Sequence, residues 1–301
     1  MSAVRNVLAD QTRFLLRTEG DDPTGTPVLL LHGVPETSSA WREVAPHLAV
    51  GRRVLVPDLP GLGGSRYAGP FDVPSLVRQL AALIELESPG RPVDVVGHDW
   101  GGTLALVLAG ERPDLVRRLC VANAPYRTIP LLRAFHIPLF TLPGVPELVF
   151  RLGGARVIDA MLDYAWRSDR TLDPVVRAEY RAAYTDPDKV AAMLAYYRGV
   201  TRPRLARLVE RRPAEPRPPV LAAELLVLWG AKDPVLPIST GESVVKDLGA
   251  RCRMVTVPEV GHFVLEEAPE LVLEVLKGFL ADPPPTAPAP VRRVRRTTAP
   301  S

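Results

Sequence analysis

The chain has 301 residues, 47% of them hydrophobic and 24% charged, with a formal net charge of +3. A chain of this size can bury one large core, and α/β domains of this length are commonly single units. The positive excess lies largely in four arginines near the C-terminus, so it predicts no nucleic-acid-binding surface. No stretch approaches the ~20 apolar residues of a membrane-spanning helix, and no leader-like apolar run begins the chain. We therefore expect a cytoplasmic protein.

The first informative element is an apolar strand predicted at 28–31, which ends in the loop His32-Gly33-Val34-Pro35. In open α/β sheets, functional sites form at the carboxyl ends of the strands. A backbone N–H of this loop can therefore donate to an oxyanion that forms at that edge. We assign this donor to Val34 and expect a structural role for the His32 side chain.

A short apolar segment at 92–96 predicts a second strand, and good helix formers at 103–109 predict a helix. Between them, Gly97, Asp99 and Gly101 have the spacing of a nucleophile elbow, a sharp strand-to-helix turn that usually presents Ser. A carboxylate is a poor acyl nucleophile but can displace a leaving group from saturated carbon. We therefore expect an alkyl ester on Asp99, the alternative being that Asp99 only caps the helix. The N–H of Trp100 is the second expected oxyanion donor.

Two later segments supply partners in the chain order nucleophile, acid, histidine. A buried strand at 225–230 is followed by Asp233, and a strand at 254–257 is followed by His262, before a helix that starts near Pro269. We expect His262 to be the general base and Asp233 to orient it. An Asp before Pro more often forms a turn, but the order of the three residues favours a triad.

Strand-like runs stop after about residue 123 and resume at about 225, which predicts an inserted cap at 126–219 whose return is rich in proline. The core then comprises 1–125 and 220–281. Residues 282–301 are rich in Pro, Ala and Thr and predict a disordered tail. Cys120 and Cys252 lie in separate strand-like runs, which predicts free thiols.

Four motifs now stand in order: His-Gly-x-Pro, Gly-His-Asp-Trp-Gly-Gly, Trp-Gly-x-x-Asp-Pro-Val and Gly-His-Phe. Together they resemble the motifs of the epoxide hydrolases and haloalkane dehalogenases of the α/β-hydrolase fold. The resemblance covers residues from about 12 to 280. It implies an α/β fold with a mostly parallel central sheet flanked by helices, and an inserted helical cap. It also implies a hydrolase that uses no cofactor and no metal and whose partner is a small apolar substrate.

Epoxide hydrolases of this family resemble one another in two cap tyrosines that donate to the epoxide oxygen, the second often within a Trp/Tyr-Tyr-Arg stretch. The run Tyr196-Tyr197-Arg198 matches that stretch. Neighbouring helical residues cannot both face one pocket, so the match selects Tyr197. The first tyrosine is replaced by His136, for which two interpretations stay open: a second donor through its imidazole N–H, or a satisfied cap residue. Packing is favoured for three further tyrosines that could replace it, Tyr164, Tyr180 and Tyr184.

The expected reaction is ring opening by Asp99, followed by hydrolysis of the ester by water that His262 activates, which releases a vicinal diol. Haloalkane dehalogenases instead hold a halide with the Trp after the nucleophile plus an Asn after His-Gly or a second cap Trp. Val34 occupies the Asn position and Trp166 has no distinctive match, so this alternative ranks second. Fluoroacetate dehalogenases carry Arg where Trp100 stands. A third alternative is a non-catalytic binding protein on the same fold.

Overall fold

The computed structural model of the chain describes residues 2–126, 133–134, 136–209, 221–248, 251–281 and 292–293. For 202–209 and 292–293 the description is of the backbone alone. Within these ranges, no helix combines the length and the apolar character needed to cross a membrane. Cys120 is buried, Cys252 is half-buried, and both are free thiols.

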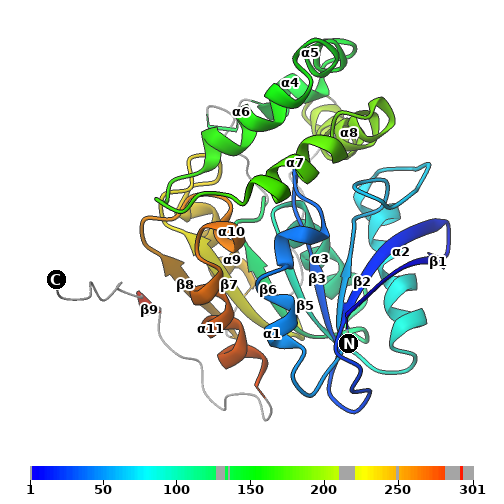
Figure 1. Cartoon of the computed structure of the whole chain (residues 1–301), viewed down its shortest axis with the longest axis vertical. Helices are drawn as coiled ribbons and strands as arrows, with labels where there is room; N and C mark the ends of the chain where they lie inside the picture. Colours follow the sequence, from blue (N-terminus) through cyan, green and yellow to red (C-terminus); the bar gives the residue numbers. More distant parts are fainter. Residues whose placement is uncertain are drawn as a thin grey trace.

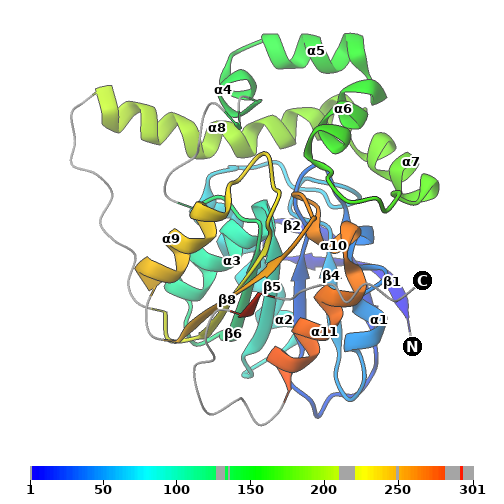
Figure 2. The ribbon, with the colours of Figure 1, turned by 90° about the vertical axis from the view of Figure 1, so that its left-hand side faces the viewer.

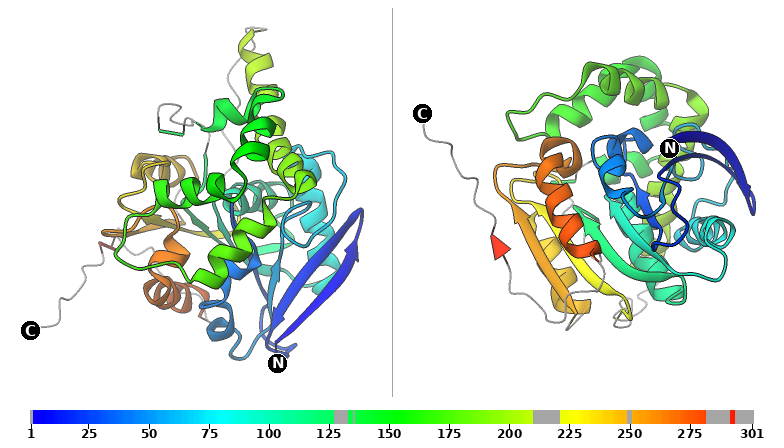
Figure 3. Two further views of the ribbon diagram at one scale, coloured as in Figure 1. Left: turned by 45° about the horizontal axis from the view of Figure 1, so that its top comes forward. Right: turned by 60° about the horizontal axis from the view of Figure 1, so that its bottom comes forward.

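A nine-stranded sheet in the order β1-β2-β4-β3-β5-β6-β7-β8-β9 forms the centre of the fold (Figure 1). The β1–β2 hairpin at one edge is antiparallel and pairs antiparallel with β4, while all the other pairs are parallel. The strands are β1 (Ala3–Ala9), β2 (Thr12–Glu19), β3 (Val28–Leu31), β4 (Val54–Pro57), β5 (Val93–His98), β6 (Val116–Ala122), β7 (Glu224–Gly230), β8 (Cys252–Val257) and β9 (Arg292–Arg293). Figure 3 shows the hairpin at the edge farthest from β8.

Helices cover both faces of the sheet, which explains why β3, β4 and β5 are buried along their whole length. In Figure 2, α1 and α11 lie on one face, and α3 and α9 lie on the other, with α2 packed beside α3. These helices are α1 (Ala45–Leu48), α2 (Val73–Glu87), α3 (Trp100–Glu111), α9 (Ile238–Leu248) and α11 (Pro269–Leu280). The predicted fold class, a mostly parallel sheet flanked by helices, is confirmed.

In the part of the chain between β6 and β7 that the structure describes, five helices lie together over one end of the sheet (Figures 1 and 2). They are α4 (His136–Thr141), α5 (Val145–Gly153), α6 (Ala155–Ala165), α7 (Pro174–Ala183) and α8 (Pro187–Val209). We call them the cap. The proline-rich return predicted before β7 lies outside the described residues. So does the predicted tail, except that the backbone of Arg292–Arg293 pairs with β8 as β9.

Two further short helices join the core to the cap. They are the 3-10 helix η1 (Ser38–Trp41) and α10 (Val264–Glu267), which comes before the helix predicted near Pro269. Glu266 of α10 accepts hydrogen bonds from Arg42 at 2.7 and 2.8 Å and from the hydroxyl of Tyr180 in α7 at 2.6 Å. The next residue, Glu267, is 1% exposed.

Glu267 ties the loop before α10 to the cap backbone. Its Oε2 accepts the N–H groups of Gly261, Arg167 and Ser168 at 3.0, 2.8 and 2.8 Å. Beside it, the N–H of His262 donates to the carbonyl of Ala165, the last residue of α6, at 3.0 Å. The loop that carries His262 and the end of α6 are therefore one hydrogen-bonded unit.

Replacing Glu267 with Ala should destabilise the protein by at least about 2 kcal/mol, because each buried N–H left without an acceptor costs about 1–3 kcal/mol. Chemical denaturation measures this loss. The matched control is Glu274→Ala on the exposed side of α11, which should change the unfolding free energy by no more than about 0.5 kcal/mol. Equal effects of the two substitutions would contradict the assigned role of Glu267.

Candidate active site

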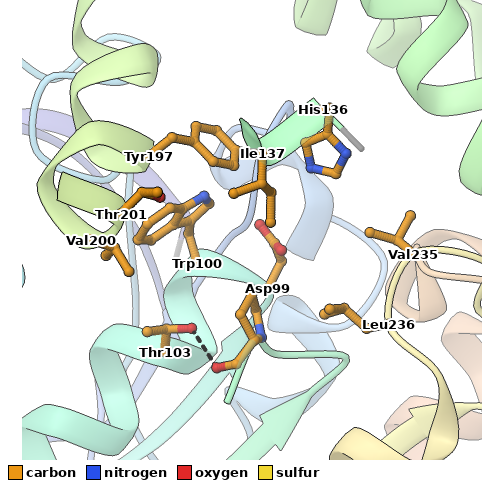
Figure 4. A pocket seen from close by; sticks show the side chains of 11 residues that line it. Asp99, Trp100, Thr103, His136, Ile137, Tyr197, Val200, Thr201, Val235 and Leu236 are labelled. Carbon is orange, nitrogen blue, oxygen red and sulfur yellow. Dashed lines mark hydrogen bonds between the residues drawn. The ribbon is translucent and has the colours of Figure 1, made fainter. Parts of the chain in front are cut away.

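Asp99 occupies the predicted sharp turn between β5 and α3. Its backbone has φ 48° and ψ −116°, a region that non-glycine residues rarely adopt. The turn is tight enough that a Cβ on Gly97 would lie 2.4 Å from the carbonyl oxygen of Gly101, and a Cβ on Gly101 would lie 2.4 Å from that of Leu31. Asp99 stands at the N-cap of α3, yet its side chain makes no capping hydrogen bond. Helix capping therefore does not account for the carboxylate, which projects into a cavity (Figure 4).

The three residues of the expected triad meet at the carboxyl edge of the sheet. His262 Nδ1 lies 2.8 Å from Asp233 Oδ2, and His262 Nε2 lies 3.5 Å from Asp99 Oδ2. Asp233 Oδ1 accepts the N–H groups of Val235 and Leu236 at 2.7 and 2.9 Å, which fixes the carboxylate. The imidazole is thus held between two carboxylates, with one nitrogen bonded to Asp233 and the other directed at Asp99.

Backbone donors surround the other side of the Asp99 carboxylate. The N–H of Val34 donates to Asp99 Oδ1 at 3.1 Å, and the backbone N–H of the next residue, Trp100, contributes to lowering the pKa of this carboxylate. The His32 ring is occupied elsewhere, since its Nε2 accepts from the N–H of Leu59 at 2.9 Å and its Nδ1 lies 2.7 Å from the carbonyl oxygen of Gly33. The loop after β3 and the start of α3 therefore supply two N–H groups at one place, as an oxyanion hole requires.

Asp99 and His262 each stabilise the charged form of the other. Burial on its own would raise the pKa of Asp99, but the hydrogen bond and the positive charge of His262 outweigh it and lower that pKa. Burial would likewise lower the pKa of His262, but the charge and hydrogen bond of Asp233, followed by those of Asp99, raise it well above its usual value of 6.5. The free site thus holds an ionised Asp99 beside a protonated His262 at neutral pH.

A second buried pair, which the sequence motifs did not identify, lies behind this site. His98 Nδ1 lies 2.7 Å from Glu36 Oε2, and both side chains have no exposed surface. The same Glu36 oxygen accepts the N–H of Gly33 at 2.8 Å, while His98 Nε2 bonds the carbonyl of His262 at 2.9 Å. The pair therefore joins the oxyanion loop to the His262 loop. Burial opposes its ionisation, but mutual attraction prevails, lowering the pKa of Glu36 and raising that of His98.

Asn123, which follows β6 directly, is a second residue that sequence reasoning missed. Its Nδ2 donates to Asp233 Oδ2 at 2.7 Å, and its Oδ1 accepts the N–H of Gly230 at 3.0 Å. It lies at φ 41°, a region in which Asn is tolerated better than most residues. The available signal was its position, because a polar residue at the carboxyl end of a parallel strand faces the site.

The cavity around Asp99 has two parts, which we name by size. The large chamber has a volume of about 190 Å³ and is lined by His262, Phe263 and side chains of α4 to α6. The small chamber has a volume of about 40 Å³ and is lined by Trp100, Thr103, Ile137 and Thr201, among others (Figure 4). Asp99, His136, Tyr197 and Val235 line both chambers. Asp99 therefore borders both chambers.

Tyr197 of α8 and His136 of α4 enter the cavity from the cap side, opposite the elbow (Figure 4). Their rings lie 5.8 Å apart between centroids at 88°, and Tyr197 packs edge-on against Trp100 at 5.2 Å. Burial and the nearby Asp99 charge raise the pKa of Tyr197, and a hydrogen bond with Trp100 opposes them. Burial lowers the pKa of His136 to about 4, although Asp99 acts in the opposite sense. Both side chains are therefore neutral near pH 7 and carry a proton to donate.

The other cap residues considered from sequence have different contacts. The hydroxyl of Tyr196 donates to Pro60 O at 2.7 Å and that of Tyr184 donates to Glu36 O at 2.7 Å, so both fasten the cap to the core, as Tyr180 does. Tyr164 lines the large chamber, and its hydroxyl donates to Arg133 O at 3.2 Å. The indole N–H of Trp166 donates to Arg170 O at 2.7 Å.

Comparison with known proteins agrees with the fold. Residues 26–269 match the model of the alpha/beta hydrolase fold. The chain belongs to this family. It is 29% identical over 277 residues to AB hydrolase superfamily protein YfhM of Bacillus subtilis, a match that covers 85% of this chain and 90% of that protein. It is also 29% identical over 282 residues to Epoxide hydrolase 3 of Xenopus tropicalis, with 85% and 71% covered.

A solved structure of one of the novel epoxide hydrolases from metagenomes of hot environments superposes with a TM-score of 0.78 at 25% identity, covering 94% of this chain and 99% of that one. This alpha/beta hydrolase is thus an enzyme of the hydrolase class with epoxide hydrolases among its relatives.

The pKa of His262 should fall when either neighbouring carboxylate is neutralised. We expect a larger decrease in Asp233→Asn than in Asp99→Asn, because Asp233 has the stronger effect on the imidazole. A pH titration of the His262 ring by NMR measures both shifts. Asp114→Asn, at an exposed site, is the control and should leave the pKa unchanged. A His262 pKa that is insensitive to Asp99→Asn would contradict the electrostatic coupling described above.

Proposed function

We propose that the protein is an epoxide hydrolase that opens an epoxide to a vicinal diol through an ester on Asp99. One observation carries the proposal: a buried, ionised carboxylate faces two neutral proton donors, Tyr197 and His136, across one apolar cavity. Attack of a carboxylate on an epoxide carbon develops negative charge on the departing oxygen. Donors on the opposite side of the substrate stabilise that charge where it forms.

In the first step, an Asp99 oxygen bonds to an epoxide carbon as the carbon–oxygen bond of the ring breaks. Tyr197 and His136 donate hydrogen bonds to the resulting alkoxide, which must then gain a proton. His262 is protonated in the free site, so the proton it releases balances this step. Conversion of Asp99 to a neutral ester favours that release, because it removes one of the charges that raise the pKa of His262.

In the second step, neutral His262 takes a proton from water, and the resulting hydroxide attacks the ester carbonyl. The N–H groups of Val34 and Trp100 lie at the carboxyl group of Asp99, where the tetrahedral oxyanion forms. Collapse of this intermediate releases the diol and restores the Asp99 carboxylate. The proton gained by His262 restores the free enzyme, so the cycle closes without a cofactor.

The haloalkane dehalogenase alternative has weaker support. Val34 offers only its backbone N–H where that family has an Asn side chain. Trp166 gives its indole N–H to Arg170, so Trp100 is the only indole among the described residues that line the cavity. A departing halide would therefore find one of its two expected donors.

Substitution of His262 with Gln should trap the ester. In this variant the alkoxide must take its proton from water instead of His262, and loss of the general base slows hydrolysis by about 10²–10⁴-fold. Intact-mass measurement after mixing with epoxides should find the mass of the whole epoxide added to the protein, and Asp99→Asn/His262→Gln should gain nothing. Addition of an alkyl group from a haloalkane, without halogen, would favour dehalogenation instead. Absence of any adduct would favour the non-catalytic alternative.

Tyr197→Phe should slow ester formation by about 10²-fold, the loss typical for one oxyanion donor. His136→Phe should slow ester formation less than Tyr197→Phe does, and the double variant should slow it more than either single variant. The matched control is Tyr196→Phe, because that hydroxyl bonds Pro60 outside the cavity. Rapid mixing at a single turnover measures these rates.

Neither donor titrates between pH 5 and 8, since the pKa of His136 is about 4 and that of Tyr197 is raised. An inflection in that range that disappears in His136→Phe would contradict the assignment.

A further inference from the structure

The two chambers differ in size by more than fourfold, and this difference restricts the substrate. The large chamber has about 190 Å³ and the small chamber about 40 Å³. For scale, an engineered apolar cavity of about 150 Å³ binds benzene, and one water needs about 10–15 Å³. A ring-sized apolar group therefore fits the large chamber, whereas the small chamber has room for a group about the size of a methyl.

The reacting ring must lie where the chambers join. The nucleophile Asp99 and the donors Tyr197 and His136 line both chambers. An epoxide held between them has one carbon on each side of the junction, so its two substituents enter different chambers. This step rests on the proposed function. Of the two chambers, His262 lines only the large one. The water that His262 activates therefore approaches the ester from the side of the larger substituent.

Both chambers are lined mainly by apolar side chains. The large chamber presents Leu139, Phe140, Val157 and Met161, and the small chamber presents Ile137 and Leu236. Of the two threonines that line the small chamber, Thr103 and Thr201, Thr103 uses its hydroxyl to bond Pro125 O at 3.0 Å. Apart from Asp99 and the imidazoles, no described lining residue carries a charge that could hold a carboxylate or phosphate of a substrate.

We infer that the enzyme acts on asymmetric, uncharged epoxides with one ring-sized apolar substituent, which occupies the large chamber, and a second substituent no larger than a methyl, which occupies the small chamber. Ile137 limits the small chamber, and Leu139 is its counterpart in the large one. These two residues lie two positions apart in α4, and each lines a single chamber.

Two epoxides of known shape test this selectivity. The first, trans-β-methylstyrene oxide, carries a phenyl and a methyl, and the second, trans-stilbene oxide, carries two phenyls. We expect kcat/KM of the full-length enzyme to be at least 100-fold higher for the first, because even a single-methylene misfit changes this ratio about 10–200-fold. Ile137→Ala should reduce the ratio of kcat/KM between the two epoxides at least tenfold. The matched variant Leu139→Ala removes a similar volume from the large chamber and should not reduce this ratio.

A complementary variant fills the small chamber. Thr201→Leu should lower kcat/KM for trans-β-methylstyrene oxide relative to styrene oxide, which has hydrogen in place of the methyl, by at least tenfold. Because this is a ratio between two substrates, a general loss of active protein cancels. Insensitivity of the ratio would overturn the assignment of the small substituent to this chamber.

The outcomes separate this inference from the function on which it rests. Equal turnover of both test epoxides by the unaltered enzyme, or turnover confined to epoxides with two large substituents, would overturn the inference and leave the epoxide hydrolase proposal standing. No turnover of any of these epoxides, together with no ester in His262→Gln, would overturn the proposed function itself.

Discussion

The site depends on how closely the elbow backbone approaches β3. Gly101 packs so tightly under the carbonyl of Leu31 that no side chain fits between them, and this contact brings Val34 within hydrogen-bonding distance of Asp99. The same turn holds Asp99 at a positive φ, which costs a residue with a side chain about 1–3 kcal/mol. A sheet buried on both faces can sustain that strain.

Burial makes the arrangement of charges as important as the arrangement of atoms. Asp99 is paired with His262, and Glu36 with His98, and the two imidazoles are 5.2 Å apart between ring centroids. An unpaired charge buried in this way would be neutralised, because burial removes its hydration. Each of these groups therefore stays charged because its partner is charged. The proton affinity of His262 therefore depends on the chemical state of Asp99, and a reaction at one residue changes the readiness of the other.

Much of this could be predicted from sequence because it is local. The elbow, the acid and the histidine each follow an apolar strand, and parallel strands bring their carboxyl ends to one edge. Glu36 and Asn123 were not predicted, because their roles arise from pairing between loops that lie far apart in the chain. Tyr197 was predicted from the resemblance to the family's Tyr-Arg stretch, whereas the two chambers depend on how the cap helices pack on the core, which no local sequence pattern determines.

The hydrogen bonds between α6 and the loop that carries His262 restrict how cap and core can be exchanged between relatives. Gly261 has no room for a side chain, since a Cβ there would lie 2.3 Å from the carbonyl oxygen of Ala165, and the backbone of His262 bonds that same carbonyl. The boundary between cap and core thus passes through peptide groups next to the base. Chimaeras that exchange caps among relatives would have to preserve this carbonyl and the acceptor that Glu267 provides, even when every side chain facing the substrate is replaced.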